Sequence, residues 1–189
     1  MHYPVITISR EYGSGGRAIG ERLAKELGVP FYDKELIFMA AKESGLSEEY
    51  IKKTEQMKST SFLYGLYMSA QQLPMNDQIF LVQSRIIRQV AQEGPCVIVG
   101  RCATNILKDK SLKIFIHAPF EERVQNVIRR TGREEASARK LVKKMDKERK
   151  AYYEYFTDSK WLDMTQYDLC IDSSRFSMVQ IVEIVKRCL

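Results

Sequence analysis

The residues best suited to chemistry lie near the N-terminus, in a short run rich in glycine. Residues 9–17 read Ser-Arg-Glu-Tyr-Gly-Ser-Gly-Gly-Arg, with three glycines in four positions and an arginine directly after them. Glycines let backbone N–H groups converge on an anion without interference from Cβ atoms, and a following helix adds the positive end of its dipole. The run predicts a phosphate-binding loop made of Gly13, Ser14, Gly15, Gly16, Arg17 and Ala18.

The elements needed to hold such a loop lie on either side of it. The apolar, mostly β-branched residues 5–8 predict a buried strand. Ile19, Leu23 and Leu27 then recur every four residues, which predicts a helix with one apolar face, and Gly28 suits its C-cap. The alternative is a glycine-rich surface turn before an ordinary helix.

The loop departs from the regular phosphate-loop pattern G-x-x-x-x-G-K-[ST] at three positions. Glu11 stands where the first glycine belongs, Arg17 replaces the lysine, and Ala18 replaces the serine or threonine. An arginine can still grip two phosphate oxygens at once. Ala18 has no hydroxyl for Mg²⁺, so the metal ligands are unknown. Any Mg²⁺ is expected to be held by water, substrate phosphates and a carboxylate elsewhere in the chain.

Length and composition indicate one globular domain. The chain has 189 residues, of which 44% are hydrophobic and 29% charged, enough for a single full core. No apolar run approaches a membrane span and the N-terminus lacks a signal-peptide core, so we expect a cytoplasmic protein. The four cysteines form no C-x-x-C pair, which favours free thiols over disulfides or a zinc site.

The net charge of +6 is concentrated in one region, because residues 123–150 carry eleven Lys/Arg and four Asp/Glu. Charge confined in this way suits a cover that closes over a polyphosphate. A surface that coats nucleic acid often spreads its charge and interleaves aromatic residues. We therefore expect a small-molecule substrate and no nucleic-acid or membrane partner, while the oligomeric state stays open.

Five short apolar segments separated by helical stretches predict an α/β fold, a five-stranded parallel sheet with helices on both faces. The strands are expected at residues 5–8, 29–32, 96–99, 112–116 and 168–172. Beyond the first helix, helices are expected at about 33–45, 77–92, 119–130, 134–155 and 177–187. Residues 56–75 lack a clean period and are expected to form a loop or a short helix.

Three polar elements should meet at one edge of this sheet, since the carboxyl ends of parallel strands lie together. They are the glycine-rich loop, Asp33 and the pair Gly100-Arg101, which follow the first three strands. Phosphoryl transfer asks a protein mainly to position two anions and neutralise charge, for which arginines are well suited. Arg17 is expected at the donor phosphates. The alternative for Arg101 is a simple ion pair with a carboxylate such as Asp33.

The basic helix adds further candidates. Arg139, Asp146, Arg149 and Tyr153 are spaced by seven, three and four residues, which places them on one helix face. The alternative is a solvated helix in which Asp146 pairs with Lys150. Arg130 and Arg133 flank Gly132, a natural hinge, and are candidates for closing on the donor, because closure excludes water from the reaction.

Residues 9–17 with Ile19-Gly20, together with residues 31–36 and 97–103, resemble the cytidylate kinase-like family, a divergent branch of the P-loop nucleoside monophosphate kinases. The resemblance runs nearly end to end and is weakest over residues 56–80. It implies a single P-loop kinase domain over residues 1–189, with a helical acceptor-side region at about 34–92 and a lid at about 129–156. It also implies ATP, Mg²⁺ and a CMP or dCMP acceptor.

The resemblance also implies roles for single residues. Gly100-Arg101 matches the Gly-Arg-Asp of cytidylate kinases, whose arginine holds the acceptor phosphate. Asp146-x-x-Arg149 resembles the Asp-x-x-Arg of their lid, which contacts the acceptor, and Arg85 loosely matches an acceptor-binding arginine. Cys102 replaces the aspartate of Gly-Arg-Asp, which leaves the cytidine specificity open.

Other functions fit parts of the same pattern. Cys102 and the irregular residues 56–75 are compatible with a kinase for another small metabolite. Glu11 and Ala18 are compatible with a regulator that binds a nucleotide without catalysis. Nucleic-acid binding through the basic helix is the least favoured, because that helix lacks the interleaved aromatic residues of a stacking surface.

Overall fold

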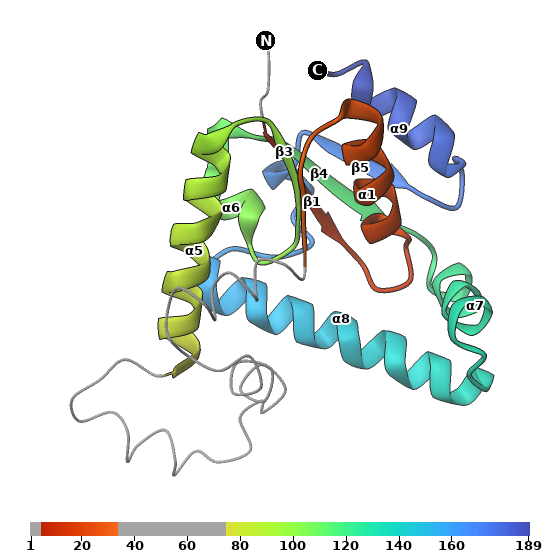
Figure 1. The fold of residues 1–189 in the computed structure, drawn as a ribbon. Helices are drawn as coiled ribbons and strands as arrows, with labels where there is room; N and C mark the ends of the chain where they lie inside the picture. The colour runs from red at the N-terminus through yellow and green to blue at the C-terminus, as the bar shows by residue number, and fades with distance from the viewer. Residues whose placement is uncertain (1–4, 34–74) are drawn as a thin grey trace, which may run out of the picture.

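A parallel sheet of five strands forms the centre of the protein in the computed structural model, which describes residues 5–33 and 75–189 (Figure 1). The strand order is β2-β3-β1-β4-β5. Ile8 of β1 aligns with Val99 of β3 on one side and with Ile114 of β4 on the other. The strands are β1 (Val5–Arg10), β2 (Phe31–Tyr32), β3 (Cys96–Val99), β4 (Leu112–His117) and β5 (Leu169–Asp172).

Helices cover both faces of this sheet, as the sequence predicted (Figure 1). Ile6 and Ile8 point to the face that α1 and α9 cover, while Val5 points to the opposite face, which α5 and α6 cover. This alternation follows from the two-residue period of a strand. The helices concerned are α1 (Gly16–Leu27), α5 (Met75–Glu93), α6 (Ala103–Leu107) and α9 (Met178–Lys186).

Two further helices connect β4 to β5 beyond the carboxyl ends of the strands (Figure 1). They are α7 (Phe120–Thr131) and α8 (Glu135–Thr157), and short 3₁₀ turns occur at Lys108–Lys110 and Met164–Gln166. Gly132 ends α7 in a left-handed conformation, with φ 65°. Val124 and Val127 of α7 pack on Ala138 and Val142 of α8, so these two helices share a small apolar core of their own.

The predicted strands and helices are confirmed within the described residues, with two differences. The short helix α6 was not predicted. The second strand was expected at residues 29–32, but only Phe31–Tyr32 pairs as a strand. Gly28 turns the chain in the left-handed region and Pro30 has no N–H to donate, so the ladder starts late. The helix expected at about 33–45 and the loop expected at 56–75 lie outside the described residues, apart from Asp33 and Met75.

Within residues 5–33 and 75–189, none of the helices combines the length and the apolar character needed to cross a bilayer.

Candidate active site

The glycine-rich loop joins the end of β1 to the start of α1 and has the shape of an anion cradle. Gly13 and Gly15 adopt left-handed φ angles of 86° and 80°, which L side chains rarely reach. A Cβ at Gly16 would lie 2.6 Å from Cβ of Arg10, so the chain can pass there only without a side chain. The first N–H groups of α1 have no acceptor within the helix, and they are available to an anion at this end.

A buried arginine of α7, Arg123, contacts the glycine-rich loop through Glu11 and Tyr12. The side chain of Arg123, on α7, is 8% exposed, and its Nε donates to the carbonyl of Ala118 at 2.9 Å. The same Nε lies 3.3 Å from the carboxylate of Glu11. Its Nη1 donates to the carbonyl of Tyr12 at 3.1 Å and forms an ion pair with Asp146. Arg123 therefore connects the loop, α7 and α8.

Glu11, at the position of the first glycine of the regular pattern, is part of this connection. Its carboxylate accepts from the N–H of Ala118 at 3.2 Å, at the end of β4. Burial raises the pKa of Glu11 above its ordinary value, while the charge of Arg123 opposes that rise. The residue that departs from the motif thus fastens the loop to β4 instead of facing an anion.

Helix α8 contacts the loop through Asp146 and Arg149. The Asp146 carboxylate accepts from the N–H of Tyr12 at 2.7 Å and pairs with Arg123, so its observed partners are in the loop and in α7. Arg149 donates from Nη1 to the carbonyl of Arg10 at 3.0 Å. The predicted common face of Asp146 and Arg149 is the face that meets the loop.

The ring of Tyr12 lies under two of the predicted arginines. The guanidinium carbons of Arg130 and Arg149 are 5.3 Å and 5.2 Å from its centroid. Arg130 also donates to the Tyr12 hydroxyl at 3.0 Å. These contacts place both arginines beside the loop.

The carboxylate of Asp33 contacts two arginines, Arg17 of α1 and Arg10 of β1. Arg17 donates from Nε to Asp33 at 2.7 Å and from Nη1 to Glu21 at 3.1 Å. Nη2 of Arg10 lies 3.8 Å from the same Asp33. Arg17, expected at the donor phosphates, is therefore paired with two carboxylates in this structure.

Arg10 is the last residue of β1, two positions after its apolar part, and it lies among several other charged groups of the site. Its pKa is lowered to about 9, mainly by burial and also by the charges of Arg149, Arg101 and Arg17, while Asp33 opposes the change. A Cβ at Gly100 would lie only 2.1 Å from Arg10 Nη1, so the guanidinium rests against the backbone after β3. The structure thus brings Arg10, Arg17, Arg101, Arg149 and Asp33 to one edge of the sheet.

The structure gives the exposure of three other predicted positions and leaves their roles untested. Ala18 is exposed in the first turn of α1, Arg85 is exposed on α5, and Arg133 is exposed between α7 and α8. The side chain of Ser14 is buried, and its hydroxyl donates to the carbonyl of Glu11. The roles assigned to these residues stay predictions.

Cys102 does not face the arginine cluster. It is 4% exposed and packs in an aromatic cluster with Phe115, Tyr153 and Trp161. Burial raises its pKa to about 12. The side chain that replaces the aspartate of Gly-Arg-Asp is therefore part of the hydrophobic core.

The four thiols should differ sharply in reactivity. We expect Cys170 and Cys188, which are exposed, to react with a thiol reagent in the native protein at pH 8. Cys96 and Cys102 are buried, with pKa values raised to about 11 and about 12, and should react only after unfolding. Counting labelled thiols by mass spectrometry with and without denaturant tests this. Fast labelling of Cys102 in the folded protein would contradict its burial.

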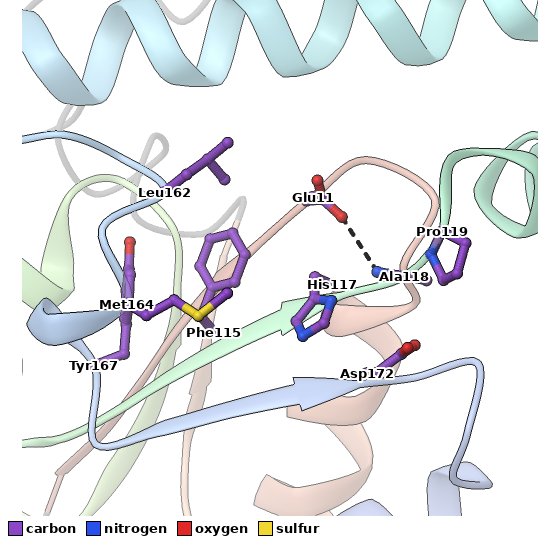
Figure 2. A pocket seen from close by; sticks show the side chains of 9 residues that line it. All are labelled: Glu11, Phe115, His117, Ala118, Pro119, Leu162, Met164, Tyr167 and Asp172. Carbon is purple, nitrogen blue, oxygen red and sulfur yellow. Dashed lines mark hydrogen bonds between the residues drawn. The ribbon is translucent and has the colours of Figure 1, made fainter.

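A pocket of about 360 Å³ opens on the other side of the loop, at the ends of β4 and β5 (Figure 2). Phe115 and Tyr167 give it an apolar floor, and Glu11 reaches its rim from the loop, where it bonds to Ala118. The remaining residues around it are His117, Pro119, Leu162, Met164 and Asp172. The sequence did not point to this pocket, because its wall comes from the segment after α8.

The sequence analysis did not predict Arg10 and Arg123 as residues of the site, although the sequence around each of them is informative. Arg10 is the first charged residue after an apolar strand, where side chains at the carboxyl edge meet ligands. Arg123 lies on the same helical face as Phe120, Val124 and Val127, a phase that predicts burial of its guanidinium. Neither signal says which partner the arginine meets.

Comparison with known proteins agrees with this geometry. The family model described as the cytidylate kinase-like family matches residues 5–175. The chain belongs to that family. The cytidylate kinase of Pyrococcus horikoshii is 30% identical over 185 residues, covering 96% of this chain and 86% of that protein. The cytidylate kinase of Pyrococcus abyssi is 31% identical, with 96% and 91% covered.

Solved structures share the fold of this cytidylate kinase-like chain. An uncharacterized protein from Eubacterium ventriosum superposes with a TM-score of 0.69 at 29% identity, covering 97% of this chain and 98% of that one. Shikimate kinase from Acinetobacter baumannii, in complex with shikimate, gives a TM-score of 0.58 at 14% identity, with 98% and 92% covered. At that identity the likeness establishes the fold alone.

Proposed function

We propose that this protein transfers the γ-phosphoryl group of ATP to a nucleoside monophosphate, with CMP or dCMP as the acceptor. The observation that carries the proposal is the gathering of four arginines, from β1, α1, the turn after β3 and α8, around the glycine-rich loop. Membership of the cytidylate kinase-like family and relatives named cytidylate kinase support the choice of acceptor.

In this proposal, the loop and the first turn of α1 bind the donor phosphates. The backbone N–H groups from Gly13 to Ala18 face the triphosphate, and Arg17 releases Asp33 or Glu21 to reach it. Positive charge next to a developing phosphoryl transition state lowers the barrier, because the cations are already in place when the charge moves.

The acceptor would lie on the β2–β3 side of the loop. Arg101 follows β3 and would bind the acceptor phosphate, with Asp33, Arg85, Asp146 and Arg149 as further acceptor contacts. Asp146 already has an ion pair with Arg123, so its proposed contact with the acceptor requires sharing that charge.

Arg130 and Arg133 are proposed to close over the donor as α7 and α8 move about Gly132. Apart from the chain neighbours of Gly132, no residue that the structure describes has an atom within 4 Å of the place that a Cβ on this left-handed glycine would take, which leaves room for such a rotation. Closure would remove water that otherwise competes for the phosphoryl group.

Mg²⁺ is expected to arrive with the nucleotide. Within the described residues there is no group of three or more His, Cys, Asp or Glu side chains that could hold a metal. Mg²⁺ is commonly bound through phosphate oxygens and several waters, with one or two carboxylates. The metal would neutralise charge on the β- and γ-phosphates.

A coupled assay of ADP release over a panel of nucleoside monophosphates tests the proposal. We expect turnover that requires CMP or dCMP and Mg²⁺, above a background of ATP hydrolysis without an acceptor. Circular dichroism on the same sample confirms that the protein is folded. Folded protein that shows no acceptor-dependent turnover would contradict the proposal.

A kinase for another small metabolite is the second candidate, and the burial of Cys102 favours it. The thiol faces the aromatic core, so this position offers no carboxylate to a cytidine. The same assay with pooled small hydroxylated and phosphorylated metabolites separates the two candidates. Turnover with a metabolite and none with nucleoside monophosphates would select the second.

A further inference from the structure

Arg10 stands out among the cations at the site because part of its hydrogen-bonding capacity is unused. Its Nε is buried and has no hydrogen-bond partner among the residues that the structure describes. The side chain is 18% exposed, and its distance to Asp33, 3.8 Å, is that of a loose ion pair. A buried guanidinium donor without an acceptor is costly unless a ligand supplies one.

Arg17, in the position of the phosphate-loop lysine, differs from Arg10 in its exposure and in its carboxylate partners. Its side chain is 46% exposed, and it donates to Asp33 and to Glu21 at 2.7 Å and 3.1 Å. Two carboxylates therefore offset its charge. Arg10 has only the looser contact with Asp33, at 3.8 Å, so of the two arginines it is the one whose charge is less fully compensated.

The position of Arg10 lies between the proposed donor and acceptor sides. Its Cβ is 2.6 Å from the place of a Cβ on Gly16, the first residue of α1. Its Nη1 is 2.1 Å from the place of a Cβ on Gly100, directly before Arg101. The side chain of Arg10 thus runs from the start of α1, beside its Cβ, to the turn after β3, beside its guanidinium.

The groups around Arg10 carry more positive than negative charge, which favours binding of an anion there. Arg149 donates to the carbonyl of Arg10, and the charges of Arg149, Arg101 and Arg17 all act on its guanidinium. Asp33 is the carboxylate that acts against them. A phosphoryl group bound here would relieve the repulsion and accept from Nε.

We propose that Arg10 binds the γ-phosphoryl group of the donor and performs the role that the lysine has in a regular phosphate loop. The proposal rests on the proposed phosphoryl transfer. An oxygen of the acceptor phosphate attacks the γ-phosphorus, the bond from that phosphorus to the bridging oxygen breaks, and its electron pair leaves with ADP. Arg10 stays protonated throughout and stabilises the charge on the oxygens of the group in transit.

Calorimetric titration of ATP and ADP, without an acceptor, into wild-type protein and Arg10→Gln tests the assignment. We expect Arg10→Gln to weaken ATP binding about tenfold or more and ADP binding less than threefold, because ADP lacks the γ-phosphoryl group. In the coupled assay, kcat should fall about 100-fold. Arg10→Lys should recover part of the ATP affinity.

Two other variants complete the design. Arg17→Gln should weaken ATP binding less than Arg10→Gln does, since its charge is already offset by two carboxylates. Arg22→Gln, in an exposed pair with Glu26 on α1, should bind and turn over like the wild type. Thermal unfolding of every variant shows whether it is folded.

Equal losses of ATP and ADP affinity in folded Arg10→Gln would overturn the assignment, because a purely structural role affects both nucleotides. A loss of ATP affinity in Arg17→Gln that exceeds the loss in Arg10→Gln would also overturn the assignment. If the wild type binds ATP but transfers nothing to any acceptor, the proposed function fails, while the ATP and ADP affinities still decide the role of Arg10. Wild-type protein that does not bind ATP would contradict both.

Discussion

Arg123→Met is expected to lower the free energy of unfolding by about 3–5 kcal/mol, because it removes one partner of a buried charge network. The Arg123 side chain, 8% exposed, lies between the carboxylates of Glu11 and Asp146, which are 17% and 19% exposed. Without the guanidinium, two largely buried carboxylates face each other without a cation. The carbonyls of Ala118 and Tyr12 lose their donor as well.

The same variant should also weaken ATP binding, because Arg123 connects the glycine-rich loop to α7 and α8. Chemical denaturation measures the first effect and calorimetry the second. Arg139→Met is the matched control on α8. Its side chain is 38% exposed and pairs with Glu121 and Glu135, which are more than half exposed, so the loss of stability should be much smaller than for Arg123→Met. Equal losses of unfolding free energy in Arg123→Met and Arg139→Met would contradict the prediction that burial makes the Arg123 ion pairs matter more.

A double variant separates charge from packing. Arg123→Met combined with Asp146→Asn leaves one fewer uncompensated carboxylate than Arg123→Met alone. We expect it to be more stable than the sum of the two single changes, with a coupling of about 0.5–3 kcal/mol. Additive effects would mean that Arg123 and Asp146 do not interact as the ion pair in the structure.

Gly13→Ala is expected to cost about 2–6 kcal/mol of stability and to abolish tight ATP binding. The residue has φ 86°, which strains an L residue by about 1–3 kcal/mol. Its new Cβ would lie 2.6 Å from the carbonyl oxygen of Arg123, a backbone atom that cannot rotate away. Relieving that overlap costs about a further 1–3 kcal/mol and must shift the loop away from α7.

Gly28→Ala separates the effect of backbone strain at positive φ from the effect of the steric overlap with Arg123. Gly28 has φ 66°, yet within residues 5–33 and 75–189 nothing but its chain neighbours lies within 4 Å of the place of its Cβ. It should therefore lose about 1–2 kcal/mol from strain alone and bind ATP like the wild type. Denaturation curves and ATP titrations of the two variants give the comparison. Gly13→Ala that binds ATP normally would mean that the loop tolerates this shift.

The architecture was predictable because its signals are local and periodic. The apolar runs at residues 96–99 and 112–116 became β3 and β4, and the four-residue spacing of Ile19, Leu23 and Leu27 became the buried face of α1. Glycines mark the ends of α1 and α7, where the left-handed conformation is needed. Such patterns need no knowledge of distant neighbours.

The location of the site was also predictable, since parallel strands bring their carboxyl ends together. The glycine-rich loop, Asp33 and Arg101 lie at that edge, as the sequence indicated. The shared face of Asp146 and Arg149 follows from helical spacing alone, and both residues do meet the loop.

Which partner each charge meets was decided only by the tertiary structure. The sequence placed Arg17 at the phosphates, but the fold brings Asp33 within 2.7 Å of it and leaves Arg10 with an unused donor. It likewise joined Glu11 to Arg123, 112 positions further on, and turned Cys102 into the aromatic core. Ion pairs and burial depend on distances between segments remote in sequence, and local periodicity carries no information about those distances.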